Sequence, residues 1–495
     1  MVEQVNYQRL RIHADLTLIS ELHVGSGKSA EIGERTSDRN GETSTALYDA
    51  ICLDDQQKPY LPGSTLRGVL RGLALSCIDD SDWVNQLFGQ QQSSDNAGCR
   101  LRVHDAFIQS MPETKNYSNS RMTESDKHLP SRIAHGIAID PVRQVVDEHK
   151  LFQFEVIPEG TVFSVIVEGD DLDRNTVLLL CQLLKHWQKQ RVAMGRNHLK
   201  GNGLVECLTT RIEVADQHSI NAWLAGEADD FYKEWVVPSE VDSFAPRYQA
   251  ALSYQFESIG MMLVNDPDRV KKKSDDHTPQ QVFAQLENGQ AVVPGKAIKG
   301  LLRSHARKIM ATLLVNKGVS LKEASNVADQ ALNSVFGSSE EASMLSFTNA
   351  LSASKSPRVK KQAFIAVDRF TGGVKEGALF HVEGTLNEAF TGDIVFIDRT
   401  KSGSGKDDVT KNWWKGLLSY VVRDMMEGDG YLGWGKNRGY GRFKLSQFTV
   451  NGKTIQCWEE VTTLAPEAEL KHWLAALQHF IEQQVEANIK GRKMS

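Results

Sequence analysis

The apolar and polar positions of this chain follow the same order of elements twice. Each copy opens with the alternating apolar residues of a β-strand, at 10–22 and again at 250–262. A polar loop comes next, and apolar residues at helical spacing then predict a helix from about residue 62 and from about residue 294. Further strands, a second helix, a glycine-rich loop and a closing strand complete each copy. This order is typical of a ferredoxin-like α+β domain, so we expect two such domains in tandem.

Four short motifs support the duplication, because they recur in the same order. They are PGSTLRGVLR and PGKAIKGLLR at 62–71 and 294–303, Leu-Phe-Gly and Val-Phe-Gly at 87–89 and 335–337, IAID and IAVD at 137–140 and 365–368, and GRNHLKGNG and GKNRGYG at 195–203 and 435–441. We therefore expect domains at 1–214 and 250–455, joined by a linker at 215–249 and followed by a helix within 456–495. An apolar stripe on that last helix predicts that it docks on the second domain.

Composition and charge narrow the class of protein. The 495 residues are 40% hydrophobic and 24% charged, which suits two or three domains with full cores. The net charge of −6 disfavours a polybasic nucleic-acid binder, although basic residues gathered in one place would still bind phosphate. The six cysteines form no metal-ligand spacing, the N-terminus lacks the apolar run of a signal peptide, and no stretch of 18 apolar residues occurs. We expect a cytoplasmic protein with reduced cysteines.

Familiar catalytic motifs are missing from the sequence. The segment GSGKS at 25–29 resembles the end of a phosphate-binding loop, but Leu22 stands where that loop needs a glycine. There is no HExxH, no GxSxG and no GxGxxG after a strand. The pair His104-Asp105 could form half of a metal phosphohydrolase site, yet it lies in a short apolar strand, and a structural role is favoured. ATPase, zinc protease, serine hydrolase and dinucleotide enzyme are therefore weak hypotheses.

Basic residues gather at the glycine-rich loops and in the helices that follow each Pro-Gly. Glycines let backbone N–H groups approach a phosphate, cations neutralise it, and an aromatic ring stacks on a base. The alternative is a tight turn or a solvated face that happens to be basic. The candidates for nucleic-acid binding are Arg67, Arg71, Lys299 and Arg303 in the helices, Arg196, Lys200, Lys436, Arg438 and Tyr440 in the loops, and Arg358 and Lys360 in a basic island at 355–361, with a second island at 269–273.

The order HVGSG, PGSTLRG, IAIDP and GRN…KGNG resembles the RAMP superfamily of CRISPR proteins, and most of all the backbone subunits of type III effector complexes. The resemblance covers about 10–212 and again about 250–450, and two units in one chain resemble the fused backbone subunit of some type III-D effectors. It implies RRM-like domains, each with a projecting β-hairpin thumb, which we place at 109–132 and 352–361. It also implies binding to a crRNA, to a target RNA, and to neighbouring backbone, large and small subunits.

The cutting residue of this family is an aspartate ahead of the Pro-Gly helix. The resemblance therefore implies a catalytic role for Asp49, in the loop before that helix. In the second copy the aspartate would be Asp276 or Asp275, displaced by an insertion. The family's reaction is attack of a ribose 2′-hydroxyl on its own phosphate. Asp49 and Asp276 would orient the hydroxyl or hold a divalent metal, Mg²⁺ or Mn²⁺.

Two other hypotheses stay open. The chain could be a crRNA-binding scaffold without catalysis, whose target is cut elsewhere in the complex. It could also be a stand-alone endoribonuclease that processes guide RNA, although no His–Tyr–Lys set accompanies His13 and His23. Because the tandem layout favours a backbone subunit, the sequence predicts an endoribonuclease that acts within a multi-subunit complex.

Overall fold

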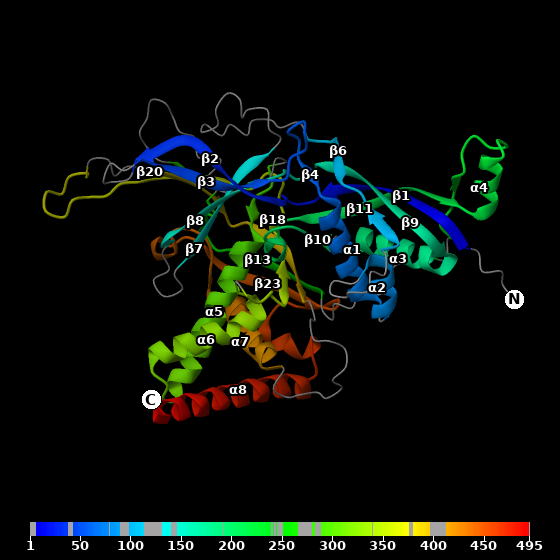
Figure 1. Cartoon of the computed structure of the whole chain (residues 1–495). Coiled ribbons are helices and arrows are strands. Elements are labelled where there is room, and N and C mark those ends of the chain that lie inside the picture. Colours follow the sequence, from blue (N-terminus) through cyan, green and yellow to red (C-terminus); the bar gives the residue numbers. More distant parts are fainter. Residues whose placement is uncertain are drawn as a thin grey trace. The chain divides into compact units, whose positions relative to one another are not determined.

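The computed structural model divides the chain into two compact units. Unit 1 comprises Met1–His198 and Asn202–Arg247, and unit 2 comprises Leu199–Gly201 and Tyr248–Ser495. Each unit has a hydrophobic core of its own, and the elements are labelled in Figure 1. The structure describes residues 6–37, 43–78, 80–89, 99–112, 131–139, 146–190, 192–238, 241, 244, 251–265, 280–282, 289–338, 340–375, 380–396 and 412–494.

The main sheet of unit 1 has the strand order of a ferredoxin-like fold. Its four central strands are antiparallel neighbours in the order β11 (Leu204–Ala215), β1 (Asn6–Leu18), β9 (Val162–Asp173) and β6 (Ala106–Ser110). Along the chain these are the fourth, first, third and second strands of a βαββαβ unit. Short strands extend the sheet: β4 (Tyr60–Leu61), β5 (Leu101–Val103), β10 (Val192–Ala193) and β12 (Lys233–Glu234).

Helices cover one face of this sheet because alternate residues of β1 are apolar. Leu10, Ile12 and Leu16 are buried in one cluster with Leu66 and Leu184, which come from two of the helices. The helices of unit 1 are α1 (Gly63–Cys77), α2 (Ser81–Phe88), α3 (Arg174–Gln190) and α4 (Gln217–Leu224). The other face of β1 carries polar and charged side chains.

A second sheet in unit 1 has the order β2 (Gly25–Ser37), β3 (Thr43–Ile51), β8 (Val146–Val156) and β7 (Arg132–Ile139). β3 runs parallel to β8, whereas the other two pairs are antiparallel. The sequence predicted a polar loop over 25–45, and much of that segment is strand instead. Its glycines and serines hide the alternation of apolar residues that normally indicates a strand.

Unit 2 repeats this plan, which confirms the predicted pair of ferredoxin-like domains. Its main sheet places β18 (Ala350–Ser352), β21 (Ala389–Phe396), β13 (Ala251–Ser258) and β23 (Arg442–Val450) side by side, with β16 (Val292–Val293), β17 (Leu345–Phe347), β22 (Gly430–Tyr431) and β24 (Lys453–Ile455) at the edges. The second sheet joins β14 (Met261–Met262), β20 (Phe380–Leu386), β15 (Gln280–Val282) and β19 (Val359–Phe364). β15 is parallel to β20, as β3 is to β8.

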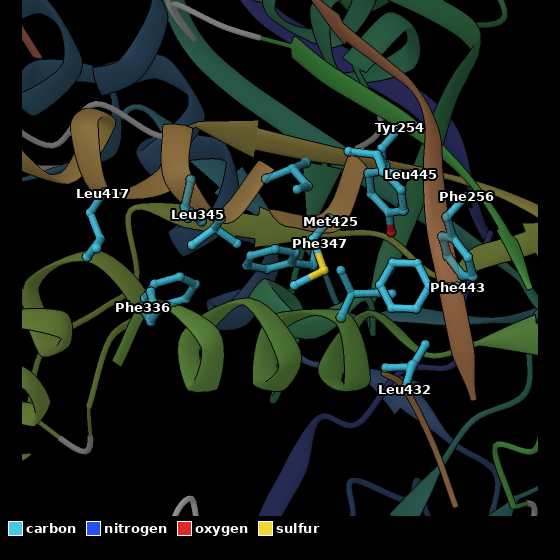
Figure 2. Close-up of a cluster of buried hydrophobic side chains, with 14 of the residues drawn as sticks. Tyr254, Phe256, Phe336, Leu345, Phe347, Leu417, Met425, Leu432, Phe443 and Leu445 are labelled. Carbon is cyan, nitrogen blue, oxygen red and sulfur yellow. The ribbon is translucent and has the colours of Figure 1, made fainter. Parts of the chain in front are cut away.

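The core of unit 2 lies between its main sheet and its helices, α5 (Gly295–Asn316), α6 (Leu321–Phe336), α7 (Trp413–Glu427) and α8 (Glu467–Met494). Figure 2 shows part of this cluster, with Met425 of α7 beside Phe347 of the sheet and Leu417 of α7 near Phe336 of α6. The C-terminal helix α8 packs along α7, where the rings of Trp413 and Phe480 stack with centroids 4.4 Å apart. Gly416 permits this approach, since a Cβ there would lie 2.4 Å from the Trp473 carbonyl oxygen.

The described part of the segment 215–249, predicted as a linker, contributes structure to unit 1. It forms α4, which begins with a capping box of Asp216 and Ser219, and then β12, which pairs with β11. The Trp235 backbone N–H donates to the Ile212 carbonyl oxygen at 2.8 Å, and Lys185 Nζ donates to the Val241 carbonyl oxygen at 2.7 Å. The polar composition that indicated a linker is that of a solvated cover on the sheet edge.

Both Pro-Gly helices begin at the same kind of junction. The Gly63 N–H donates to Asp105 Oδ1 at 2.7 Å, and the Gly295 N–H donates to Asn349 Oδ1 at 3.0 Å. A Cβ at Gly63 would lie 2.2 Å from the Val103 carbonyl oxygen, so only glycine fits. Asp105 therefore ties a helix to a strand, in agreement with the structural role favoured for His104-Asp105.

Candidate functional site

Asp49 lies in strand β3 of the second sheet of unit 1, and not in a loop as the sequence predicted. Its backbone pairs with Ser29 of β2 on one side and with Phe154 of β8 on the other. Because β3 pairs with a strand on each side, it continues as regular strand through Asp49 to Ile51, where the sequence suggested a loop. The Asp49 side chain is 47% exposed, so a ligand can reach its carboxylate from solvent.

The glycine-rich loop after α3 brings Arg196 to Asp49, where Nη1 and Oδ2 form an ion pair. The Arg196 guanidinium also lies 5.5 Å from the ring centroid of Phe154. The backbone holds the loop in place, because the Arg196 N–H donates to the His23 carbonyl oxygen at 2.9 Å. The structure thus joins two predicted site residues that no sequence spacing connects.

This pair has the chemistry of a phosphoryl-transfer site. A carboxylate can accept a proton from an attacking hydroxyl. A planar guanidinium can bind two phosphate oxygens at once and stabilise the negative charge that builds up on them. Both side chains are partly exposed, Arg196 by 40%, so a backbone phosphate can approach them without any rearrangement of the core.

The described residues around Asp49 do not form a ready set of ligands for a resident metal ion. One Asp49 carboxylate oxygen already carries the Arg196 guanidinium. No group of three or more His, Cys, Asp or Glu residues able to hold a metal occurs within the described parts of the chain. Mg²⁺ and Mn²⁺ take several oxygen ligands in proteins, and the described residues around Asp49 do not supply such a set.

The two glycine-rich loops share one backbone geometry. In unit 1 the Met194 N–H donates to the Gly203 carbonyl oxygen at 2.8 Å, and in unit 2 the Leu432 N–H donates to that of Gly441 at 2.8 Å. Positive φ angles recur at the same offsets: Gly195, Asn197, Gly201 and Gly203 in one loop, and Gly433, Gly435, Gly439 and Gly441 in the other. The loops therefore correspond over 195–203 and 433–441, two residues earlier in unit 2 than the sequence motifs predicted.

This correspondence assigns the basic residues of the loops to equivalent places. Lys200 ends the 3-10 turn His198–Lys200, and Arg438 ends the turn Lys436–Arg438. Arg438 is exposed, with its guanidinium 5.2 Å from the Trp434 ring centroid and 5.8 Å from that of Phe364. Lys436 is half-buried, and burial lowers the pKa of its amine. Both loops thus keep a cation at the end of a tight turn.

Tyr440 is not placed to stack on a base. Its side chain is only 4% exposed, and its hydroxyl donates to Gln362 Oε1 at 2.5 Å. Its ring packs against Trp434 and Phe364, with centroids 5.4 and 5.9 Å away. The sequence could not distinguish this buried ring from a surface ring, because the strand β19 that covers it is distant in the chain.

The arginines that end the two Pro-Gly motifs bind protein groups. Arg71 Nη2 donates to Asn85 Oδ1 at 2.8 Å, and Arg303 Nη2 donates to Asn333 Oδ1 at 2.6 Å. Arg303 Nη1 also donates to the Gly337 carbonyl oxygen at 2.7 Å, while Arg67 donates to the Phe88 carbonyl oxygen. These three arginines join α1 to α2 and α5 to α6, and the RNA contact that the sequence predicted for them stays a prediction.

A signal for this role was present in the sequence. Asn85 and Asn333 each stand four residues before the glycine of the Phe-Gly motif, in the segments NQLFG and NSVFG. Lys299 occupies the position of Arg67 in the second motif, but the described contacts include no hydrogen bond from its amine to the neighbouring helix. Burial, and after it nearby positive charge, lowers the pKa of Lys299 to about 8.

Several predicted features lie outside the described residues. These are Asp275 and Asp276, the basic island at 269–273, and most of the predicted thumb at 109–132. Arg358 and Lys360 are exposed, at the start of β19, beside the ion pair of Lys361 with Glu383 at 3.4 Å. The predicted thumb at 352–361 is wrong in position, because this segment ends one strand and begins the next.

The projecting segment of unit 2 follows β19 instead, at 365–375, and is drawn in yellow beyond β20 in Figure 1. Val367 bridges Val374, and Asp368 Oδ1 accepts backbone N–H groups from Phe370 and Thr371 at 2.8 and 2.9 Å. Phe370 at its tip is fully exposed, and Ile365, Val367 and Val374 are more than half exposed. The result is an ordered hairpin with an apolar tip, which we call the unit 2 tip.

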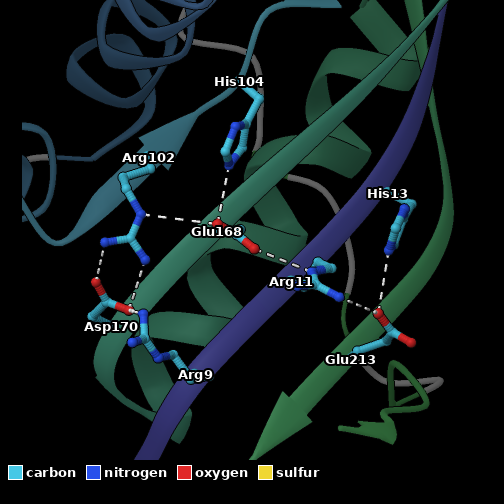
Figure 3. A network of polar contacts seen from close by, with 8 residues as sticks. All are labelled: Arg9, Arg11, His13, Arg102, His104, Glu168, Asp170 and Glu213. Carbon is cyan, nitrogen blue, oxygen red and sulfur yellow. Dashed lines mark hydrogen bonds and ion pairs between the residues drawn. The ribbon is translucent and has the colours of Figure 1, made fainter.

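The open face of the main sheet in unit 1 carries a network of compensating charges. Glu168 contacts Arg11 at 3.2 Å, His104 at 3.0 Å and Arg102 at 3.9 Å. Burial alone would raise the pKa of Glu168, but hydrogen bonds from His104 and Arg11 hold it below its ordinary value. Figure 3 shows that the network continues to Arg9, Asp170, His13 and Glu213. This face therefore presents paired charges, which the sequence pattern did not predict.

Fold and site together define a tandem ferredoxin-like protein with a partly exposed carboxylate–guanidinium pair. The family model of the RAMP superfamily matches residues 15–206 and 230–444. These two regions make up most of the chain, so the protein belongs to the RAMP superfamily. A search of curated proteins gave no match. Within the described residues, no helix combines the length and apolar character needed to cross a bilayer.

A search of solved structures matches chains of two cryo-EM structures of the Type III-B Cmr-beta complex, one in the apo state and one bound to cognate target RNA. Each chain is 16% identical to this one with a TM-score of 0.29. Each alignment covers 40% of this chain, and it covers 97% of the apo chain and 96% of the RNA-bound one.

Proposed function

We propose that this chain is a backbone subunit of a type III CRISPR effector complex that binds crRNA and cuts complementary target RNA. Two RAMP regions in one chain support the role of a fused backbone subunit. The observation that carries the cutting activity is the ion pair of Asp49 with Arg196. It sets a proton acceptor beside a phosphate-binding cation on a surface that solvent reaches.

In the proposed reaction a ribose 2′-hydroxyl attacks its own 3′-phosphate. Asp49 accepts the hydroxyl proton while a bond forms between the 2′-oxygen and phosphorus. The bond from phosphorus to the 5′-oxygen of the next nucleotide breaks, and the leaving oxygen takes a proton from water. Arg196 binds the phosphate oxygens as their negative charge increases. The products are a 2′,3′-cyclic phosphate and a 5′-hydroxyl.

The unit 2 tip supports the binding of a paired RNA. In-line attack requires a nucleotide that has left its stacked geometry. Apolar side chains inserted between base steps unstack them, and Phe370 is fully exposed at the end of an ordered hairpin. We assign the tip the role of the thumb of unit 2.

Cations at equivalent places in the two loops support binding to the RNA backbone without sequence preference. Lys200 and Arg438 end matching turns, and the exposed Arg358 and Lys360 add charge near β19. Sequence would then be read by pairing between guide and target. A requirement for Mg²⁺ or Mn²⁺ stays a prediction that a metal titration of cleavage would test, and no step above depends on it.

The proposal is tested by purifying the full-length tagged chain from its host with the RNA and subunits that accompany it. The bound RNA is sequenced, and a labelled RNA complementary to it is then offered to the complex. We expect defined cuts whose 5′ fragments end in a 2′,3′-cyclic phosphate. A complex that holds guide RNA but leaves the complementary RNA intact would contradict cutting and favour the scaffold hypothesis. Cleavage of free guide precursor by the chain alone would favour the processing endoribonuclease.

A further inference from the structure

The place that Asp49 occupies in unit 1 can be located in unit 2 by two steps of backbone pairing. The first step aligns the segments after the first strand of each unit. In unit 1 the Gly203 N–H donates to the Glu21 carbonyl oxygen at 2.7 Å, and the Arg196 N–H donates to the His23 carbonyl oxygen at 2.9 Å. In unit 2 the Gly441 N–H donates to the Met261 carbonyl oxygen at 2.9 Å, and the Trp434 N–H donates to the Leu263 carbonyl oxygen at 2.7 Å. Because the two loops correspond, residues 21–23 match residues 261–263.

The second step carries this alignment across the second sheet. Leu22 bridges Ile157 in unit 1, and its match Met262 pairs with Thr385 in unit 2. Ile157 therefore matches Thr385, and counting back along β8 and β20 matches Phe154 with Val382. Asp49 pairs in parallel with Phe154, and Gln281 pairs in parallel with Val382. The register thus places Gln281 where unit 1 has Asp49.

The residue types that follow these positions agree with the register. Asp49 precedes Ala-Ile-Cys, and Gln281 precedes Val-Phe-Ala. Asp275 and Asp276 stand six and five positions before Gln281 in the sequence, outside the described residues. Five or six residues along a strand span more than about 15 Å. An aspartate that far before Gln281 could take the place of Asp49 only if the chain did not continue as a regular strand.

The partner of the carboxylate is replaced as well. The loop correspondence puts Trp434 at the position of Arg196. Its indole ring packs against Tyr440 and Phe364 and carries no charge. The glutamine amide does not take up a proton at neutral pH, and the indole N–H cannot supply the charge of a guanidinium. The described residues at these two positions of unit 2 provide neither a carboxylate nor a guanidinium, although the loop retains a cation, Arg438.

We infer that the two units divide the work: unit 1 cuts RNA through Asp49 and Arg196, and unit 2 holds RNA without cutting it. This inference rests on the proposed function, since it assigns the cutting to one of two similar units. It gives one cut for each copy of this chain in a complex. Cuts would therefore be spaced by the length of RNA that a whole chain covers.

The inference is tested by mapping every cut in one labelled target RNA, with complexes that carry the full-length chain. Asp49→Asn is compared with Asp275→Asn and Asp276→Asn together, and with Asp275→Glu and Asp276→Glu together. The glutamate pair keeps the charge of the segment, so assembly is preserved, while a catalytic aspartate would be displaced by a methylene group. Bound guide RNA is quantified in each complex.

We expect Asp49→Asn to remove every cut made by this chain, and the variants at 275 and 276 to retain the wild-type cuts. Loss of particular cuts in the glutamate pair, with those cuts retained in Asp49→Asn, would overturn the inference and leave the proposed function standing. If neither Asp49→Asn nor any variant at 275 and 276 removed a cut, the proposed function itself would fail. The two failures are therefore distinguishable in one gel.

Discussion

Asp49 of β3 and Arg196 of the loop after α3 form an ion pair that joins the second sheet of unit 1 to its glycine-rich loop. Both side chains are partly exposed, by 47% and 40%. Pairs in such positions contribute no more than about 1 kcal/mol to stability. Stability therefore gives little reason to hold these two groups together, whereas the proposed cleavage reaction uses both.

Replacing Arg196 should separate catalysis from folding. In Arg196→Ala we expect the single-turnover cleavage rate to fall by about 10²-fold, because a donor to the phosphate oxygens is lost. The melting temperature should change little, since the lost ion pair is exposed. Arg196→Lys keeps the charge without the planar fork and should retain part of the rate. A wild-type rate in Arg196→Ala would exclude this residue from the reaction.

Replacing Arg303 should lower the stability of the protein, unlike the replacement of Arg196. The Arg303 guanidinium satisfies Asn333 and the Gly337 carbonyl oxygen, so Arg303→Ala should destabilise the protein by about 2 kcal/mol, or roughly 4–8 °C in melting temperature. Lys322→Ala, which removes an exposed cation from α6, is the matched control and should melt like the wild type. If Arg303→Ala left the melting temperature unchanged but weakened RNA binding, the structural role would be wrong.

Lys299 should make RNA binding depend on pH near pH 8. Burial lowers the pKa of its amine to about 8, below the value in the unfolded chain. The folded protein therefore releases this proton as the pH rises through 8, and an RNA contact made by the charged amine is lost. Over the same range the stability of the protein rises, because the unfolded chain binds more protons than the folded one.

The measurement for Lys299 is the salt dependence of RNA affinity at pH 7 and at pH 9.5. For the wild type we expect the slope to fall by about one between these values. Lys299→Arg stays charged and should keep its slope at both. A wild-type slope that is equal at both pH values would show that Lys299 does not contact RNA.

Arg438 should contribute one phosphate contact. Its guanidinium is exposed above Trp434 and Phe364, at the place of Lys200 in the other loop. In Arg438→Ala we expect weaker RNA binding and a salt slope lower by about one, and in Arg438→Lys a slope near that of the wild type. If the slope of Arg438→Ala matched the wild type, the loop would be a structural turn only.

Much of the fold could be predicted from the sequence because its signals are local. The alternation of β1 and the helical spacing after each Pro-Gly are read within a few residues, and they gave the ferredoxin-like order twice. The unit 2 tip was misplaced because Val359–Phe364 is basic and polar, yet it pairs with β20. Such pairing depends on a partner strand that lies further along the chain, which a local pattern does not reveal.

The candidate site was predictable only residue by residue. Asp49 and Arg196 were each identified, but their contact depends on the register of a sheet that the sequence did not indicate. For the same reason Gln281 escaped notice, since its place is defined by pairing with Val382. The contact of Arg71 with Asn85 could have been predicted, because Asn85 and Asn333 occur at equal spacing before the Phe-Gly of the two copies.

The most direct measurement of cutting by unit 1 is the single-turnover cleavage rate of complexes that carry either Asp49→Asn or Asp55→Asn. Both changes remove one negative charge from the same segment, and Asp55 is an exposed turn residue without a role in the proposed reaction. We expect Asp49→Asn to lose about 10²–10⁴-fold in rate, the usual contribution of a proton acceptor, with guide and target binding unchanged. Asp55→Asn should cut like the wild type. Equal rates in the two variants would contradict a catalytic role for Asp49.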